Sequence, residues 1–307
     1  MKHFLLFIGL HLLILIAQTS AYAGSKPLSM SEIIAGTKAT DWRTLDPENT
    51  LYLELASGRV IIELNPQFAP KHSENVKALA REKYWDGLAI VRSNDNYVVQ
   101  WADPNSEKPE LKRKILKAKP TLPAEFDQEI RRNTSFVKLK DGDVYAPEVG
   151  FADGFPVARD LKADAKAGKT WLTHCYGAVG AGRDESIDSG GGTELYVVIG
   201  HSPRHLDRNV TLLGRVVQGM ELLSALPRGT AAMGFYDKPE QQVPIKSIRV
   251  AADVPIAERT NLEILRTDTA VFQQLVESRR NRPESWFHKQ AGHIELCNVP
   301  IPVRLHK

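Results

Sequence analysis

Residues 205–221 read HLDRNVTLLGRVVQGME, and no other segment of this 307-residue chain says as much about its architecture. Val210 to Val217 is rich in aliphatic and β-branched side chains, which favour an extended strand. Met220 to Leu226 has the apolar spacing of a short helix. The segment therefore predicts a strand that leads directly into a helix.

The residues on both sides of this segment predict many more short strands. Apolar side chains alternate over 51–55 and again over 60–64, and Ser57-Gly58 between them is a turn signal, so this part is typical of a β-hairpin. A helix is expected from Pro70, because apolar side chains recur at helical spacing just after it. Further strands are expected at 88–91, 97–101, 171–179, 194–199 and 245–250. Many short strands with only two brief helices predict an all-β fold with a closed barrel rather than an α/β sheet.

The regions outside these strands have residue patterns that differ from those of the barrel strands. The basic stretch 106–120 is interpreted as a solvated loop, and 136–170 as a long insertion between strands. An amphipathic helix is expected over 269–281 and a last strand over 294–299. The expected organisation is a signal peptide, a lead-in, a barrel domain and a C-terminal helical extension, at 1–23, 24–48, 49–252 and 253–307.

The first 23 residues have the pattern of a cleavable signal peptide. Lys2 and His3 are followed by an apolar run over 4–17, and Ala21-Tyr22-Ala23 is a small-x-small cleavage site. The apolar run is shorter than the roughly 20 residues that span a bilayer. We therefore expect a periplasmic or secreted protein that is not bound to the membrane after cleavage.

The composition bears on the expected binding partners, and the cysteine count on whether a disulfide forms. Charged residues make up 25% of the chain, apolar residues 42%, and the formal net charge is only +3, so a nucleic-acid partner is not expected. The two cysteines, Cys175 and Cys297, would be permitted to form a disulfide in an oxidising compartment. Two buried free thiols are the alternative, and the sequence leaves both open.

No cofactor or metal is expected. Gly177, Gly180 and Gly182 do not open a helix in a βαβ unit, so they are not a dinucleotide fingerprint. They are better explained by close approach of backbone or substrate. His288, His293 and Cys297 lack the fourth ligand or the open geometry of a zinc site.

Three stretches in order carry a family resemblance. They are YWDGLAIVR at 84–92 with its continuation to 104, GTELYVVIG at 192–200, and the segment 205–221. Together they resemble the cyclophilin-type peptidyl-prolyl cis-trans isomerases, here in an exported bacterial form with a C-terminal extension. The resemblance covers about 51–250 and implies a closed eight-stranded antiparallel barrel capped by two helices.

The resemblance also implies a site for X–Pro bonds. Arg92 matches the catalytic arginine, Tyr97 an aromatic that packs on the proline ring, and Gln100 a glutamine that bonds both the substrate and the arginine. The reaction is rotation about the X–Pro amide bond, which breaks no bond and requires only that the twisted amide be stabilised. A fixed cation beside an apolar surface for the proline ring can supply that stabilisation. The implied substrate-binding residues are Val98, Gly182, Glu194, Leu195, Tyr196, His205, Leu206 and Val210.

Several positions depart from the family pattern. Val91 replaces a histidine before the arginine, Trp101-Ala102 replaces two glycines, and the hydroxyl of Tyr196 is expected to crowd the pocket floor. Glu194 replaces a glutamine, and pairing with Arg92 would blunt the arginine. The main hypothesis is an isomerase that assists the folding of exported proteins. The alternative is a catalytically weak or inactive chaperone that binds proline-containing peptides or unfolded exported proteins.

Overall fold

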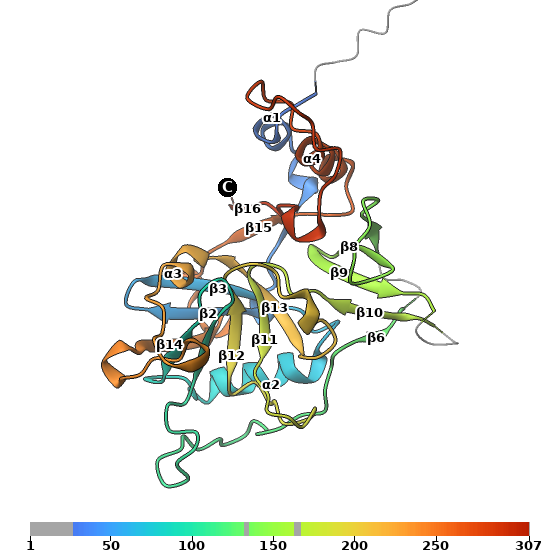
Figure 1. The fold of residues 1–307 in the computed structure, drawn as a ribbon. Coiled ribbons are helices and arrows are strands. Elements are labelled where there is room, and N and C mark those ends of the chain that lie inside the picture. The colour runs from blue at the N-terminus through green and yellow to red at the C-terminus, as the bar shows by residue number, and fades with distance from the viewer. Residues whose placement is uncertain (1–26, 132–134, 163–166, 307) are drawn as a thin grey trace, which may run out of the picture.

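The computed structural model describes residues 27–131, 135–162 and 167–306, which fold into three adjoining parts (Figure 1). A barrel is joined to a second sheet and to a module built from both ends of the chain. The expected signal peptide at 1–23 lies outside the described residues. No helix in the described ranges has both the length and the apolar character needed to cross a bilayer.

Eight antiparallel strands close the barrel, as the sequence predicts. Their order around the barrel is β11-β12-β5-β4-β14-β2-β3-β13. In chain order the barrel strands are β2 (Thr50–Leu55), β3 (Gly58–Leu64), β4 (Ala89–Ser93), β5 (Val98–Ala102), β11 (Ala178–Ala181), β12 (Leu195–Val198), β13 (Leu212–Gln218) and β14 (Val243–Val250). The hairpin expected at 51–64 is β2 and β3, which pair from Thr50 with Glu63 to Leu55 with Gly58.

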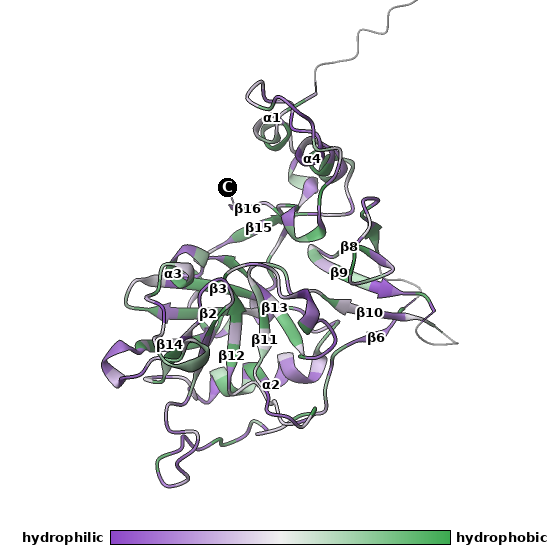
Figure 2. Ribbon diagram, in the orientation of Figure 1, coloured by the Kyte–Doolittle hydropathy of each residue, from purple (hydrophilic) through white to green (hydrophobic). Residues whose placement is uncertain are grey.

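The period-2 pattern of these strands explains the barrel core. Alternate residues of β2 and β3 point inward and join one buried cluster, and the barrel strands carry much of the hydrophobic colour in Figure 2. Two helices, α2 (Pro70–Arg81) and α3 (Met220–Ser224), add Val76, Leu79 and Leu223 to the same cluster. Each such buried side chain contributes about 1.5–3 kcal/mol of transfer free energy, so both helices are held to the barrel by apolar burial.

The region 136–170 is strand-rich and belongs to a second sheet. The sheet has the order β6-β10-β9-β8-β7. Its strands are β6 (Gln128–Glu129), β7 (Val137–Lys138), β8 (Glu148–Ala152), β9 (Phe155–Asp160) and β10 (Lys169–Leu172). Phe155, Val157 and Leu172 pack in one cluster with Tyr196 and Leu212 of the barrel. The second sheet is therefore docked on the outer surface of the barrel.

The single strand expected over 171–179 is wrong. Its first part belongs to β10 in the second sheet, and the barrel strand β11 begins only at Ala178. The chain turns between them, because Gly177 has a φ of 82° and the Ala178 amide bonds back to the Cys175 carbonyl. One apolar run thus spans two strands of different sheets, which periodicity alone cannot divide.

The lead-in and the tail form the third part together. Strand β1 (Trp42–Thr44) pairs with β15 (Leu262–Leu265), which pairs with β16 (Val303–Leu305). The helix expected over 269–281 is α4 (Ala270–Arg280), and it lies against α1 (Met30–Ala35).

The strand expected over 294–299 is wrong, because this segment contains a 3-10 turn. Residues Leu296–Asn298 form a 3-10 turn, in which the Asn298 amide bonds the Glu295 carbonyl. Cys297 is bonded to Cys175 across a sequence separation of 122 residues, so the disulfide is the correct one of the two alternatives.

Short 3-10 turns connect many of these elements. They are η1 (Ala39–Asp41), η2 (Pro47–Asn49), η3 (Arg204–Leu206), η4 (Ala232–Gly234), η5 (Pro239–Gln241), η6 (Ala251–Asp253), η7 (Ile256–Glu258) and η8 (Leu296–Asn298). The basic stretch 106–120 contains no helix or strand and is largely exposed, as expected of a solvated loop.

Candidate functional site

Arg92 is the centre of the candidate site. It lies on β4 opposite Gln100 of β5, and it is only 8% exposed. Its Nη1 donates to Gln100 Oε1 at 3.1 Å, and its Nε donates to the Met233 carbonyl at 2.7 Å. Burial lowers the pKa of Arg92 from a very high ordinary value. The guanidinium is thus held from two sides, and a group that titrates so far above neutrality stays charged.

Gln100 connects Arg92 to Glu194. The Gln100 Nε2 donates to Glu194 Oε2 at 2.9 Å, while its Oε1 faces Arg92. Burial raises the pKa of Glu194, and the bond from Gln100 partly opposes this. The expected direct pairing of Glu194 with Arg92 is not what the described residues show, because the Gln100 amide lies between the two charges.

Gly182 leaves space beside the hydrogen bond between Gln100 and Glu194. A Cβ at this position would lie 3.1 Å from Glu194 Cβ and 3.5 Å from Gln100 Nε2. A side chain there would therefore crowd Glu194 and would contact Gln100. The structure thus brings Arg92, Gln100, Glu194 and Gly182 together, as the resemblance implies.

Two aromatic rings flank the guanidinium of Arg92. The ring centre of Tyr97 is 5.5 Å from the Arg92 Cζ, and that of Phe235 is 5.3 Å away. Both distances suit a cation–π contact. Tyr97 was expected here, whereas Phe235 was missed, because it comes from the connection between α3 and β14 and no sequence motif marks it.

The apolar residues expected near the proline divide into two groups. Val98, Tyr196 and Val210 share one cluster with Tyr97 on the outer surface of the barrel. Leu195 points the opposite way, since it is 0% exposed in the barrel core. Neighbouring strand residues face opposite sides, so β12 presents Tyr196 outside and cannot also present Leu195.

A buried histidine, His174, fixes the hydroxyl of Tyr196. The Tyr196 hydroxyl and His174 Nε2 are 2.8 Å apart, and His174 Nδ1 is 2.8 Å from Asp207 Oδ1. Burial also raises the pKa of Tyr196, which therefore stays neutral. The hydroxyl that was expected to crowd the pocket floor is instead engaged by His174, a residue that sequence reasoning missed.

His205 and Leu206 lie on the connection between β12 and β13. Leu206 ends the 3-10 turn η3 and is half-buried, and His205 is exposed. Arg204 anchors this turn by ion pairs to Asp207 at 2.5 Å and to Asp143 at 2.8 Å.

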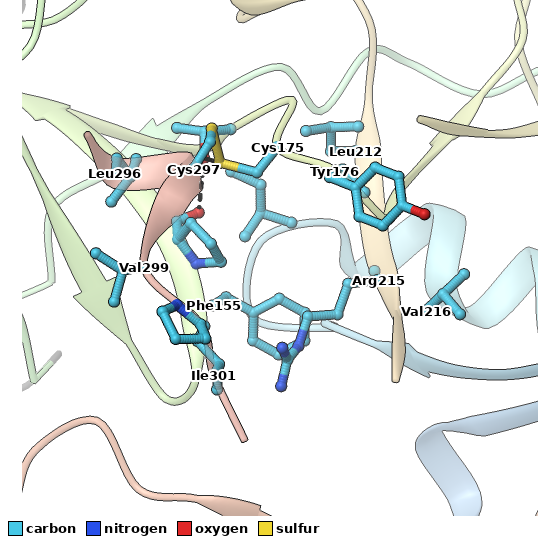
Figure 3. Close-up of a pocket in the computed structure, with 16 residues that line it drawn as sticks. Phe155, Cys175, Tyr176, Leu212, Arg215, Val216, Leu296, Cys297, Val299 and Ile301 are labelled. Atoms are coloured by element: carbon cyan, nitrogen blue, oxygen red, sulfur yellow. Dashed lines mark hydrogen bonds between the residues drawn. A yellow bond between two sulfur atoms is a disulfide. The ribbon is translucent and has the colours of Figure 1, made fainter. Parts of the chain in front are cut away.

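A separate cavity of about 230 Å³ lies where the barrel, the second sheet and the tail meet (Figure 3). Phe155, Leu212 and Ile301 give it an apolar wall, and the Cys175–Cys297 disulfide lies on its rim. None of the predicted site residues is among those that line it. This cavity is therefore distinct from the arrangement around Arg92.

Comparisons with known proteins agree with the fold. The family described as "Cyclophilin type peptidyl-prolyl cis-trans isomerase/CLD" matches residues 50–250. A Brucella suis protein named as a probable peptidyl-prolyl cis-trans isomerase is 26% identical over 193 residues, which are 61% of this chain and 76% of that protein. A Synechocystis relative, whose name places it among thylakoid lumen peptidyl-prolyl cis-trans isomerases, is 23% identical over 62% of this chain and 50% of its own length.

A solved structure has the same fold. The crystal structure of cyclophilin AquaCyp293 from Hirschia baltica superposes with a TM-score of 0.68 and 21% sequence identity. The match covers 91% of this chain and 99% of that one. It therefore includes more than the residues that the family match covers.

Proposed function

Because the chain belongs to the cyclophilin-type peptidyl-prolyl cis-trans isomerase family, we propose that Arg92, Tyr97 and Gln100 form its catalytic site. The observation that carries this proposal is the fixed guanidinium of Arg92. Two of its nitrogens are held by Gln100 and Met233, and Nη2 has no hydrogen bond to any residue in the described ranges. A restrained cation with a free donor is what the reaction requires.

The physical demand of the reaction is modest but specific. Rotation about the X–Pro bond has a barrier of about 18–20 kcal/mol, because the amide is conjugated. In the twisted state the prolyl nitrogen is pyramidal and more basic. Nη2 of Arg92 would donate to that nitrogen, and its position is fixed before the substrate arrives, so no reorganisation is needed at the moment of rotation.

The proline ring would rest on the apolar residues beside Arg92. Tyr97 and Val210 support this assignment because they are partly exposed members of one apolar cluster, in which Val98 and Tyr196 are buried. Leu206, also partly exposed, lies on the connection that precedes Val210. The His174 bond to the Tyr196 hydroxyl would keep that ring in one orientation. The partners would be proline-containing segments of unfolded proteins.

The assay that tests the site uses the oxidised chain without residues 1–23. A proline tetrapeptide is offered in a protease-coupled measurement, and the rate is compared with the uncatalysed exchange, which takes tens of seconds or more. We expect a clear rate above background. A folded sample with no such rate would overturn the catalytic assignment and favour the peptide-binding alternative.

We also propose that the protein is exported and assists the folding of exported proteins. The signal-like pattern at 1–23 supports this, and so does the disulfide, because such bonds persist in oxidising compartments. We expect the mature chain to begin at Gly24 and to appear outside the cytoplasm. Terminal sequencing of the fractionated protein checks this, and an intact Met1 in the cytoplasmic fraction would contradict it.

Replacing Glu194 with glutamine is expected to stabilise the protein at neutral pH. Burial raises the pKa of Glu194, so the folded state favours the protonated acid. That contribution is present at low pH and is lost as the pH rises through the raised folded-state pKa. The E194Q variant keeps an acceptor for Gln100 without the charge, so its Tm should exceed that of the parent by about 1–4 °C at pH 7.

The pH dependence makes the Glu194 prediction specific. The difference in Tm should shrink as the pH falls through the raised folded-state pKa of Glu194 towards the ordinary carboxyl pKa, because the folded parent is then protonated as well. Thermal unfolding between pH 4 and pH 8 measures it. Glu240→Gln, at an exposed carboxylate, is the matched control and should show no such trend. A lower Tm for E194Q at every pH would refute the explanation.

A further inference from the structure

The connection between α3 and β14 is fixed against β4, the strand that carries Arg92. The Gly229 amide donates to the Ser93 carbonyl at 2.9 Å, and the Tyr236 amide donates to the Val91 carbonyl at 3.0 Å. Arg92 itself forms a bridge with Phe235. These backbone bonds make the segment 229–236 (the β4 flap) an ordered neighbour of Arg92 rather than a free loop.

The tip of the β4 flap has a tightly constrained backbone. Met233 has a φ of 58° and Gly234 a φ of 78°, both in the left-handed region. A Cβ on Gly234 would lie 2.5 Å from Asn94 Cα, so the tip approaches the β4–β5 turn as closely as a backbone can. This approach accompanies the bond from Arg92 Nε to the Met233 carbonyl at 2.7 Å.

Two large apolar side chains of the β4 flap are exposed beside Arg92. Phe235 is 37% exposed although its ring lies 5.3 Å from the guanidinium, and Met233 is 65% exposed. Exposed apolar side chains that gather next to a functional group mark a binding surface more often than isolated ones do. Phe235 contacts Arg92 on one side and leaves part of its ring open to solvent.

We propose that Met233 and Phe235 form a subsite for a large apolar side chain adjacent to the proline of the substrate. This inference rests on the proposed role of Arg92 as the group that contacts the prolyl amide. A residue next to that amide must lie close to the guanidinium, and the β4 flap supplies the apolar surface there. The flap also positions Arg92 through the Met233 carbonyl.

A substrate-selectivity experiment tests the subsite. Two pairs of proline peptides are compared, in which the residue either after or before the proline is Phe or Ala. In the double variant Met233→Ala/Phe235→Ala, the ratio of kcat/KM for the Phe peptide to that for the Ala peptide should fall at least about fivefold in one of the pairs, because the substrate side chain loses the apolar surface that it would cover. The affected pair assigns the subsite to the position before or after the proline.

Controls separate the subsite from folding and from the catalytic assignment. Ile256→Ala removes a side chain that is 77% exposed in a different part of the molecule and should leave the ratio as in the parent. The single variant Phe235→Leu keeps an apolar surface and should retain most of the parental preference for the Phe peptide. It can be measured even if the double variant fails to fold. An unchanged ratio, or equal losses on both peptides, would overturn the subsite. A parent protein inactive on every peptide would instead overturn the role of Arg92.

Discussion

The Arg92→Ala variant is expected to lose at least about a hundredfold in kcat/KM on a proline tetrapeptide, as is typical when one fixed donor to a transition state is removed. Alanine deletes the only group here that combines a free donor at Nη2 with fixation by Gln100 and Met233 within the described residues. The protease-coupled isomerase assay measures the loss. Arg92→Lys keeps the charge but not the planar fork, so it should recover only a small part of the rate.

The matched control for Arg92 is an arginine with no link to the site. Arg266 is a half-exposed residue of the tail that pairs with Asp268, and Arg266→Ala should retain the parental rate. Full activity of Arg92→Ala would contradict the catalytic assignment. If neither the parent nor the variant shows turnover, but both bind a proline peptide equally well by calorimetry, the binding-module alternative would be favoured.

Removing the Cys175–Cys297 disulfide is expected to lower the free energy of unfolding by about 2–5 kcal/mol. The bond closes a loop with a sequence separation of 122 residues, and in the chain-entropy view its loss frees a long segment of the unfolded chain. Guanidinium unfolding of the Cys175→Ala/Cys297→Ala variant against the oxidised parent measures the change. The reduced parent should behave like the variant.

Loss of the disulfide should destabilise the tail before it destabilises the barrel. Cys175 and Leu296 belong to one buried cluster with Phe272 of α4 and Trp42 of β1, whereas the barrel has its own core. Limited proteolysis of the variant should therefore cut the tail before the barrel. Simultaneous loss of both parts, or no loss of stability at all, would contradict a bond that mainly secures the terminal module.

Most of the barrel was predictable because most of its strands have a local sequence pattern, whereas β11 could not be separated from β10 by pattern alone. Alternation over 51–64 fixed the first hairpin, and the motif at 205–221 fixed the β13–α3 unit. The whole of the second sheet was not predictable. Its strands β6 and β7 have only two residues each, which is too short for a sequence pattern, and they are held by pairing with neighbouring strands.

The site was predictable only where a motif carries it. Arg92 and Gln100 face each other across two paired strands, so a motif on those strands brings them together. Phe235 and His174 reach the site from separate connections, and their contacts depend on how distant segments pack. The charge of Glu194 was foreseen, but the amide that lies between it and Arg92 depends on side-chain orientation, which no pattern encodes.

The pairing of β1 with β15 has a consequence for the order of assembly. Strand β1 lies near the start of the chain, and both β15 and Cys297 lie near its end. Strand β1 therefore keeps an unpaired edge until residues 262–265, more than 200 positions later in the chain, are available to pair with it. Contacts between such distant segments are slow to form, and unpaired strand edges favour aggregation in the meantime. Joining the two chain ends is thus a late event, and covalent closure by the disulfide can follow only when they have met.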